Sequence, residues 1–232
     1  MLKAVLFDLD NTLVDRDRAF RECVQAQFPD PAVRAELFRL DQDGHGDPDA
    51  LFHCWQRHSG TSMNQALLGR LLAERLQPDH GLLQALHALS RHVQLGIITN
   101  GGSDTQRRKF QAAGLEAVIP HGHLWISGEV GKAKPDPAIF LLASRTLGIA
   151  PGTCLFIGDR EQEDQAGATA AGMRARRVGA VLNGEQLNAL IREEEELGDS
   201  SGPSLPVGTS STSSLTFIQD SQIGDAVERV PT

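Results

Sequence analysis

The chain has 232 residues, of which 40% are hydrophobic and 22% are charged, the composition of an ordinary soluble globular protein with one large core or two smaller ones. Its formal net charge of −8 argues against nonspecific nucleic-acid binding and against attachment to an anionic membrane surface. The three cysteines, Cys23, Cys54 and Cys154, are odd in number and widely spaced, which indicates neither a disulfide framework nor a zinc site.

A short apolar run at the start of the chain ends in two aspartates. Ala4–Phe7 has the length and side chains of a strand buried on both faces, and Asp8 follows it without a turn residue. The carboxyl ends of parallel strands form the ligand crevice of an α/β sheet, so we expect Asp8 and Asp10 to point into it. Two carboxylates this close repel each other unless a proton or a cation intervenes. The stretch therefore predicts a divalent-metal and nucleophile site; the alternative is an ordinary polar turn over residues 8 to 12.

No targeting or membrane signal accompanies this strand. A basic and then apolar leader is missing before it, and no apolar run approaches the roughly 18 residues of a membrane span. We therefore expect a cytoplasmic protein with no membrane partner. In that reducing location Cys154, which lies in an apolar run, is expected to be a small core residue.

Residues 16 to 76 show helical rather than strand periodicity. Apolar residues recur three and four positions apart, as in Phe20, Val24 and Phe28, and breaks fall near residues 29–31, 43–46 and 59–60. We expect four helices here. They would form a small α-helical cap domain over residues 15–77, inserted into a core domain made of residues 1–14 and 78–232.

From Asp79 onward helices and strands alternate. Helices are predicted over Gly81–Arg91, from Ser103 or Asp104 as the capping residue to Ala113, over Ala138–Leu147 and over Glu161–Ala171. Strands are predicted over Val93–Thr99, near Ala117–Ile119, over Thr153–Ile157 and over Arg174–Val178, with an extended piece at His123–Ser127. Strands separated by helices of this length predict right-handed crossovers. The fold class is therefore α/β, with a Rossmann-like, mainly parallel sheet covered by helices on both faces.

The last part of the chain changes in composition. Gly184–Glu196 is predicted to be helical, with its four consecutive glutamates as a solvated helix end. Residues 198–214 are rich in Gly, Ser, Pro and Thr and predict a flexible linker. An edge strand over Leu215–Ile218 and a short helix near Ser221–Val230 are expected to follow it.

Four strand ends or loops carry reactive side chains. They are Asp8-Leu-Asp10-Asn-Thr12, Thr99-Asn100-Gly101, Lys134-Pro135, and Gly158-Asp159 with Asp164 five residues later. In this order and spacing they resemble the four motifs of the haloacid dehalogenase-like (HAD) hydrolase superfamily, phosphatase type. The resemblance covers roughly residues 1 to 180, and the helical insertion resembles the family's small C1 cap.

The aspartates have distinct expected roles. Asp8 is expected to attack phosphorus and form an aspartyl-phosphate, which divides one difficult hydrolysis into two easier steps. Asp10 is placed to protonate the leaving oxygen and then to deprotonate the attacking water. The resemblance implies that Mg²⁺ is held by the Asp8 carboxylate, the Asp10 backbone carbonyl and Asp159, and oxygen ligands suit that ion.

The remaining motif residues are expected to bind the phosphoryl group. The Thr99 hydroxyl and the backbone amides of Asn100 and Gly101 would donate to its oxygens, because glycine lets the backbone approach closely. Lys134 would offset the negative charge of both Asp8 and phosphate.

Three assignments around these motifs leave alternatives. Lys132 is a rival for the role of Lys134, although the position before Pro135 matches the family pattern. Asp164 would orient Lys134 or a metal-bound water as a supporting residue; otherwise it is an ordinary polar residue on a helix turn. Arg160 departs from the family pattern, in which a small polar residue is frequent, and it either has no effect or adds a salt bridge at the rim.

Several other polar features have weaker interpretations. Asp41–Asp47 resembles a calcium loop but lacks its spacing and its final glutamate, and it is interpreted as a loop over the active site or as a solvent turn. His53, Trp55 and His58 are candidates for the substrate pocket, with Trp55 equally suited to the cap core. Arg107–Lys109 is interpreted as a solvated helix face, and the pair His121 and His123 as incidental.

The resemblance implies a Mg²⁺-dependent phosphatase acting on a small phosphorylated metabolite, with the cap closing over it. The alternatives are a phosphomutase of the same fold, a haloacid dehalogenase, and a non-catalytic binding protein that keeps the fold. Carbon–halogen hydrolysis needs neither a metal nor an acid at the second position, so Asp10 and Asp159 argue against it. The sequence contains no motif that identifies the substrate or the oligomeric state.

Overall fold

A five-stranded parallel sheet with strand order β3-β2-β1-β4-β5 lies at the centre of the computed structural model, which describes residues 1 to 199. In the middle strand Phe7 pairs with Ile97 on one side and with Ile157 on the other. The predicted α/β class with a parallel sheet is confirmed. The strands are β1 (Ala4–Phe7), β2 (Gln94–Thr99), β3 (Leu124–Ile126), β4 (Cys154–Gly158) and β5 (Arg174–Arg177).

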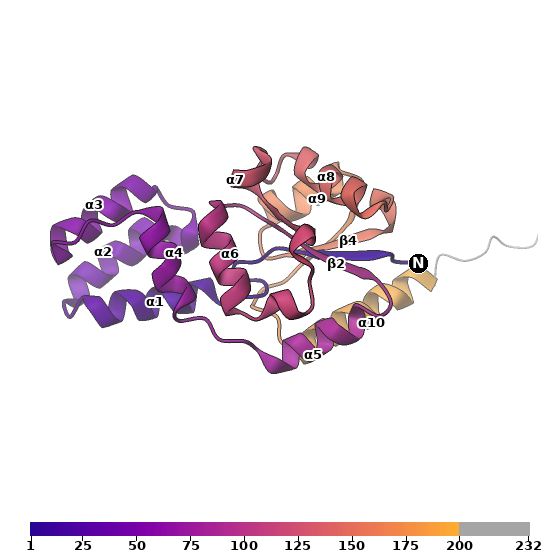
Figure 1. Cartoon of the computed structure of the whole chain (residues 1–232), viewed down its shortest axis with the longest axis horizontal. Helices are drawn as coiled ribbons and strands as arrows, with labels where there is room; N and C mark the ends of the chain where they lie inside the picture. The colour runs from indigo at the N-terminus through magenta and orange to yellow at the C-terminus, as the bar shows by residue number, and fades with distance from the viewer. Residues whose placement is uncertain (200–232) are drawn as a thin grey trace, which may run out of the picture. The chain divides into compact units, whose positions relative to one another are not determined.

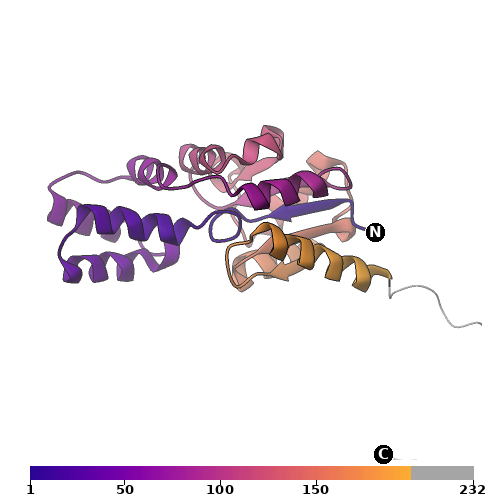
Figure 2. The same cartoon turned by 90° about the horizontal axis from the view of Figure 1, so that it is seen from below.

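Helices cover both faces of this sheet. Val5 and Phe7 belong to an apolar layer with α5 (His80–Leu89) and α10 (Gly184–Asp199), which lie side by side in Figures 1 and 2. Ala4 and Leu6 belong to a second layer with α8 (Pro137–Leu147) and α9 (Ala166–Ala170). Because alternate residues of a strand point to opposite faces, β1 is apolar throughout. Cys154 is fully buried in the second layer, as predicted.

Four helices occupy the segment between β1 and α5, as predicted. Each begins at a side chain that accepts a hydrogen bond from the first turn: Asp15, Asp30, Asp47 or Asn64. The buried ring of Trp55 packs edge-on against Phe28, with ring centroids 4.9 Å apart. The helices are α1 (Arg16–Gln27), α2 (Pro31–Asp41), α3 (Pro48–Ser59) and α4 (Gln65–Ala73), with a 3₁₀ turn η1 (Gln42–Gly44) after α2. The domain boundaries at residues 14 and 78 remain a prediction.

The carboxyl ends of the strands face this helical group. In Figure 1, β1 runs from the N-terminus toward α1–α4, and α6 (Ser103–Ala112) lies between these helices and the sheet. Residues 8 to 15 lead from the end of β1 into α1. Side chains that follow β1, β2 and β4 therefore meet side chains of the helical group.

The third strand lies elsewhere than predicted. Ala117–Ile119 is not a strand; the chain forms a 3₁₀ turn η2 (Leu115–Ala117) and then a loop in which Ile119 is fully buried. The extended piece, after the turn η3 (His121–His123), supplies β3, and Leu124 pairs with Ile97. A short buried apolar run has the same pattern in a loop and in a strand, so the pattern alone did not separate them.

Two helix ends also differ from the predictions. Gly102 precedes the first turn of α6 without a side-chain cap, so neither Ser103 nor Asp104 is the capping residue. Ser103 instead donates to Glu129 of the short helix α7 (Ser127–Val130), and Asp104 accepts from Arg108 at 2.8 Å. The predicted helix 161–171 is divided into a π-helical turn η5 (Glu161–Gln165) and α9, after the 3₁₀ turn η4 (Pro151–Thr153) and β4.

The end of the described chain corrects two further predictions. Helix α10 continues to Asp199, so residues 198 and 199 belong to a helix and not to the linker. Within the glutamate run, Glu194 is buried and binds Arg174 and Arg176 of β5, so it is not solvated. The remaining linker residues, the predicted edge strand and the predicted terminal helix lie outside the described residues. In the described part, no helix is long and apolar enough to cross a membrane.

Candidate active site

A cavity of about 240 Å³ opens at the carboxyl ends of β1, β2 and β4. Seven of the eight predicted site residues line it, and the eighth, Asp164, lies buried beside it. The helical group supplies part of the wall, including Arg16, Gln65 and Leu68. The seven lining residues are Asp8, Asp10, Thr99, Asn100, Gly101, Lys134 and Asp159.

Lys134 connects two carboxylates at the base of the cavity. Its Nζ lies 2.5 Å from Asp8 Oδ1 and 2.6 Å from Asp164 Oδ1, and all three side chains are nearly inaccessible to solvent. Burial would lower the pKa of Lys134, but the charges of Asp8 and Asp164 outweigh burial and raise it. Lys134 is therefore a fixed positive charge next to Asp8, and Asp164 orients it.

Burial dominates the electrostatics of Asp8. It raises the pKa of Asp8 to about 7, against the lowering effect of Lys134, and the nearby charges of Asp164 and Asp10 raise it further. Burial also raises the pKa of Asp159, again with a contribution from Asp164. Asp8, Asp159 and Asp164 lie so close together that their ionisation at the same time is energetically unfavourable unless a further cation is bound.

Asn100 holds the Lys134 loop through its side chain. Its Nδ2 donates to the Lys134 carbonyl oxygen at 3.0 Å, and its Oδ1 accepts from the Lys134 amide at 2.8 Å. The Lys134–Pro135 peptide bond is cis. The side chain of Asn100 thus ties the end of β2 to the lysine, a contact that was not predicted, since only the backbone amide of Asn100 was assigned a role.

Gly101 has a conformation that favours glycine. Its φ is 138°, and a Cβ atom there would lie 3.0 Å from Gln106 Cδ. Its amide donates to Ser127 Oγ at 2.9 Å, so this predicted phosphate donor already has a partner in the structure. Ser127 was not predicted, since it lies in the segment between the second and third motifs.

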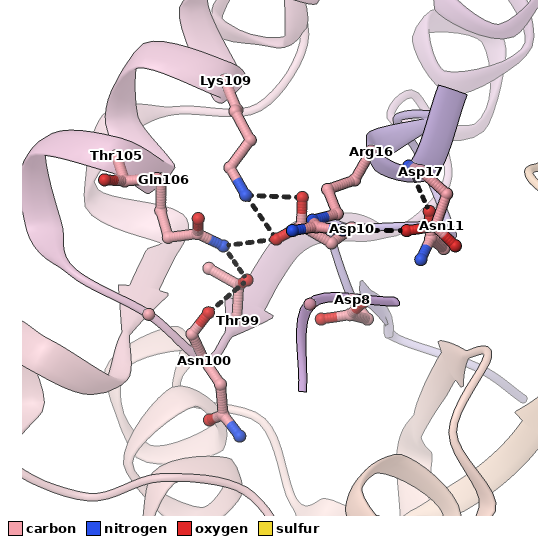
Figure 3. Close-up of polar contacts among 12 residues, drawn as sticks. Asp8, Asp10, Asn11, Arg16, Asp17, Thr99, Asn100, Thr105, Gln106 and Lys109 are labelled. Carbon is pink, nitrogen blue, oxygen red and sulfur yellow. Dashed lines mark hydrogen bonds and ion pairs between the residues drawn. The ribbon is translucent and has the colours of Figure 1, made fainter. Parts of the chain in front are cut away.

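Two residues of α6 bind Asp10 (Figure 3): Lys109, which was interpreted as part of a solvated face, and Gln106, which was assigned no role. Lys109 Nζ lies 2.6 and 2.5 Å from the two carboxylate oxygens of Asp10. Gln106 Nε2 donates to Asp10 Oδ2 at 3.0 Å and to Thr99 Oγ1 at 2.6 Å. Burial alone would raise the pKa of Asp10, but Lys109 lowers it. The prediction of a solvated face for Lys109 is wrong, because the 106, 109, 110 and 113 face of α6 is the buried one.

The loop after α2 reaches the cavity. Asp43, Gly44 and His45 line it, and the loop is held by a buried two-pronged ion pair between Arg16 and Asp41. Its predicted position over the site is confirmed, while its role in substrate choice remains a prediction.

Arg160 connects the core to this loop. Its Nη2 donates to the Asp43 carbonyl oxygen at 3.3 Å, and its Nε lies 3.7 Å from Asp159 Oδ2. Nearby, His45 Nδ1 lies 3.2 Å from Glu163 Oε1. Of the two alternatives for Arg160, the structure therefore favours a salt bridge at the rim.

A model of the family described as haloacid dehalogenase-like hydrolase matches residues 2–172. The chain belongs to this family. The resemblance of its four motifs to those of the HAD hydrolases is thus explained by relationship, and these motifs meet in one cavity.

Named phosphatases are among the relatives of this HAD hydrolase. This chain is 31% identical over 222 residues to a phosphoserine phosphatase of Thermus thermophilus. The alignment covers 75% of this chain and 87% of that protein. The chain is 30% identical over 199 residues to a glyceraldehyde 3-phosphate phosphatase of Methanopyrus kandleri, with 77% and 84% covered. It is 36% identical over 202 residues to an N-acylneuraminate-9-phosphatase of Mus musculus, with 75% and 81% covered.

Solved structures support the same fold. A HAD-hydrolase of Bacillus subtilis bound to magnesium has a TM-score of 0.61 and 22% identity to this chain. The matched region covers 82% of this chain and 99% of the Bacillus subtilis chain. At this identity the likeness concerns the fold. The parallel sheet and helices of this HAD hydrolase therefore match those of solved family members.

One group of carboxylates in this HAD hydrolase fits a divalent cation. One carboxylate oxygen each from Asp8, Asp159 and Asp164 lies within 4.8 Å of the others. An all-oxygen set in which the pKa values of Asp8 and Asp159 are raised suits a hard ion such as Mg²⁺. The Asp10 side chain is turned toward Lys109, which leaves only its backbone carbonyl for the predicted metal role. Within residues 1 to 199 a second group exists, Glu36, Cys54 and His58, but Arg57 already binds Glu36.

The other candidate residues are not among those that line the cavity. His53, Trp55 and His58 are not among the described residues that line the cavity. Trp55 is a core residue of the helical group. Lys132 is exposed and pairs with Asp136 at 3.5 Å, so Lys134 is the lysine of the site. The suggestion that His53 and His58 line the pocket is therefore wrong, and of the two alternatives for Trp55 the core position is confirmed.

Proposed function

We propose that this phosphoric monoester hydrolase of the HAD family is a Mg²⁺-dependent phosphatase that acts on a small phosphorylated metabolite through an aspartyl-phosphate on Asp8. The observation that carries the proposal is the contact of Asp8 with Lys134 at the base of a cavity that also contains Asp10 and Asp159. A nucleophile, a proton-transfer group and a positive charge are thus within reach of one phosphoryl group.

The first step transfers the phosphoryl group to Asp8. A carboxylate oxygen of Asp8 forms a bond to phosphorus, and the bond from phosphorus to the leaving oxygen breaks with its electron pair on that oxygen. Asp10, in its protonated form, donates the proton that converts the leaving oxygen to an alcohol and is left as a carboxylate, the form that the ion pair with Lys109 stabilises. Lys134 stays protonated and stabilises the charge that develops on the phosphoryl oxygens.

The second step regenerates the enzyme. Asp10, now a carboxylate, takes a proton from a water molecule as the water oxygen attacks phosphorus. The bond between phosphorus and Asp8 breaks with its electrons on Asp8, and inorganic phosphate leaves. Thr99 and the amides of Asn100 and Gly101 are proposed to bind the phosphoryl oxygens in both steps, with the Gly101 amide exchanging Ser127 for phosphate.

Mg²⁺ would be held by Asp8, the Asp10 backbone carbonyl and Asp159, where it would supply positive charge to the phosphoryl oxygens. The crowding of carboxylates and the raised pKa values of Asp8 and Asp159 support this assignment. Asp164 is proposed to keep Lys134 in place. The segment 15–77 is proposed to act as the cap, with the loop over residues 41–47 facing the substrate.

The decisive experiment replaces the nucleophile. Asp8→Asn keeps the size of the side chain and removes the attacking oxygen anion, so the rate of p-nitrophenyl phosphate hydrolysis with Mg²⁺ should fall at least about 10³-fold. Asp104→Asn, at an exposed carboxylate of α6, is the matched control and should retain the wild-type rate. Unchanged hydrolysis by Asp8→Asn would contradict the aspartyl-phosphate mechanism.

The substrate is to be identified by a panel of phosphorylated metabolites. The panel contains the compounds that name the three relatives, phosphoserine, glyceraldehyde 3-phosphate and N-acylneuraminate 9-phosphate, together with nucleotides, sugar phosphates, phosphoglycolate and flavin mononucleotide. Release of inorganic phosphate is the expected product. Conversion of a sugar phosphate into its isomer would indicate the phosphomutase alternative.

A further inference from the structure

Helix α6 places two buried polar side chains beside the proposed proton-transfer group, and neither belongs to the four motifs. Lys109 is 3% exposed and Gln106 is 1% exposed. A buried lysine is costly unless its charge is paired, and here the partner is Asp10. Since both side chains point from α6 toward Asp10 in Figure 3, their burial is coupled to the placement of that carboxylate.

The contacts fix the carboxylate in more than one direction. Lys109 Nζ reaches both oxygens of Asp10, at 2.6 and 2.5 Å, which opposes rotation of the carboxylate about its last bond. Gln106 binds one of these oxygens at 3.0 Å and, through the same amide nitrogen, Thr99 Oγ1 at 2.6 Å. The proposed proton donor and the proposed phosphoryl ligand Thr99 are therefore held by one amide.

Helix α6 also packs against helix α4, and this contact holds α6, with Lys109 and Gln106, in position. Thr105 Oγ1 donates to the Gln65 carbonyl oxygen at 3.3 Å. A Cβ atom on Gly69 of α4 would lie 2.5 Å from Thr105 Oγ1, so the two helices are in close contact at this glycine. Asp10 is thus positioned from the same helix that packs against the wall of the cavity formed by α4.

We propose that Lys109 and Gln106 are positioning residues for proton transfer, and that they hold the Asp10 carboxylate in the place from which it serves the leaving oxygen. The inference rests on the proposed function, in which Asp10 carries the proton. Neither residue is required to touch the substrate. A different interpretation, in which Lys109 only neutralises a buried charge, makes a different prediction about leaving groups.

A series of substituted phenyl phosphates separates these interpretations. A well-placed acid matters for a basic leaving group such as phenolate and matters little for p-nitrophenolate, which departs readily without a proton. kcat/KM reports the first phosphoryl transfer, so it excludes the shared hydrolysis of the aspartyl-phosphate. For Lys109→Met, kcat/KM should fall about 10²-fold on phenyl phosphate and less than about tenfold on p-nitrophenyl phosphate.

Gln106→Leu provides a second variant that changes no charge. It should steepen the dependence of kcat/KM on leaving-group basicity in the same direction as Lys109→Met. Lys132→Met, at an exposed lysine outside the site, is the matched control and should leave the dependence unchanged. Thermal unfolding of each variant identifies those that are folded at the assay temperature.

A double substitution tests whether Lys109 acts through Asp10. Once Asp10→Asn has removed the acid, adding Lys109→Met should cost little more on any member of the series. An equal fall for all leaving groups, or a full further loss in the double variant, would overturn the proposal. If Asp10→Asn alone left the slope of kcat/KM against leaving-group basicity at the wild-type value, the proton role of Asp10 would be wrong as well. The Asp8→Asn experiment tests the nucleophile separately.

Discussion

At the scale of single residues, Asp8 is subject to opposing effects. Burial raises its pKa from 3.8 to about 7, while Lys134 lies 2.5 Å away and favours the ionised form. In the metal-free protein the folded state therefore keeps a proton on Asp8 that the unfolded state releases near pH 4. A divalent cation in the same place would favour the carboxylate and displace this proton.

This shift sets a pH dependence of stability. Between about pH 4 and about pH 7 the folded protein binds more protons at Asp8 than the unfolded chain, so the free energy of unfolding should fall as pH rises through this window. We expect the metal-free wild type to lose stability relative to Asp8→Asn over that window, as measured by urea unfolding with a chelator. A rising difference would show that Asp8 is ionised throughout, with its pKa below that of the unfolded chain.

Gly158 determines how closely Asp164 approaches β4. A Cβ atom at residue 158 would lie 2.3 Å from Asp164 Oδ2, so Gly158→Ala should displace Asp164, which orients Lys134. We expect a loss of about 1–3 kcal/mol in the free energy of unfolding together with a fall in kcat. Gly152→Ala is the matched control, because a Cβ atom there would lie 4.0 Å from its nearest neighbour, the Gly172 carbonyl oxygen. Unimpaired turnover in Gly158→Ala would contradict this role of Asp164.

The motif residues could be predicted from the sequence, whereas their supporting residues could not. Asp8, Thr99, Lys134 and Asp159 each follow a strand or open a loop, and parallel strands bring such positions to one edge. Lys109 lies in the run Arg-Arg-Lys of a helix, and its burial depends on the rotation of α6 about its axis. The periodic apolar positions Phe110 and Ala113 contained a signal of that rotation, but three consecutive cations more commonly indicate a polar face.

At the scale of elements, the loop after α2 depends on one buried ion pair. Arg16, at the start of α1, binds Asp41, the last residue of α2, and the side chains are 7% and 5% exposed. Asp41 also accepts from the Gly44 amide at 3.2 Å, so it holds the turn that lines the cavity. Loss of one partner would leave the other charge buried and unpaired.

We therefore expect Asp41→Asn to reduce the free energy of unfolding by about 3 kcal/mol or more. Asp17→Asn removes a second carboxylate from the same guanidinium at a more exposed position, 22% accessible, and should cost less than about 1 kcal/mol. Urea unfolding of both variants measures the difference. Equal losses would indicate that burial of the Arg16–Asp41 pair contributes nothing beyond a surface ion pair.

Element boundaries were predicted less well than element types. The helices of residues 16 to 73 were recognised from apolar residues at helical spacing and from the breaks between them, and the first two strands from apolar runs that end in polar residues. The third strand was misplaced because Ala117–Ile119 and Leu124–Ile126 are both short and apolar. The burial of Glu194 depends on Arg174 and Arg176, which lie about twenty residues earlier in the chain and give no local signal.

At the scale of the whole molecule, both the α/β class and the family could be predicted from the sequence. The parallel sheet was inferred from alternation of strands and helices, and the family from four motifs that together span residues 8 to 164. Substrate identity was beyond this reasoning, because the cavity wall formed by residues 43 to 72 has no sequence motif. Its shape depends on how α4 packs on α6, a contact between segments separated in the chain.

The pairing of the central strand has a consequence for how the protein is made. Ala4 is translated before its two partners, Gln94 and Cys154, which come much later in the chain. During that interval α1 to α4 can pack against one another, because their contacts are between segments close in sequence. β1 has no strand to pair with until β2 and β4 have been synthesised. Asp8 and Asp10 are therefore translated before Lys134 and Asp159, and the active site can be assembled only after β4 has emerged.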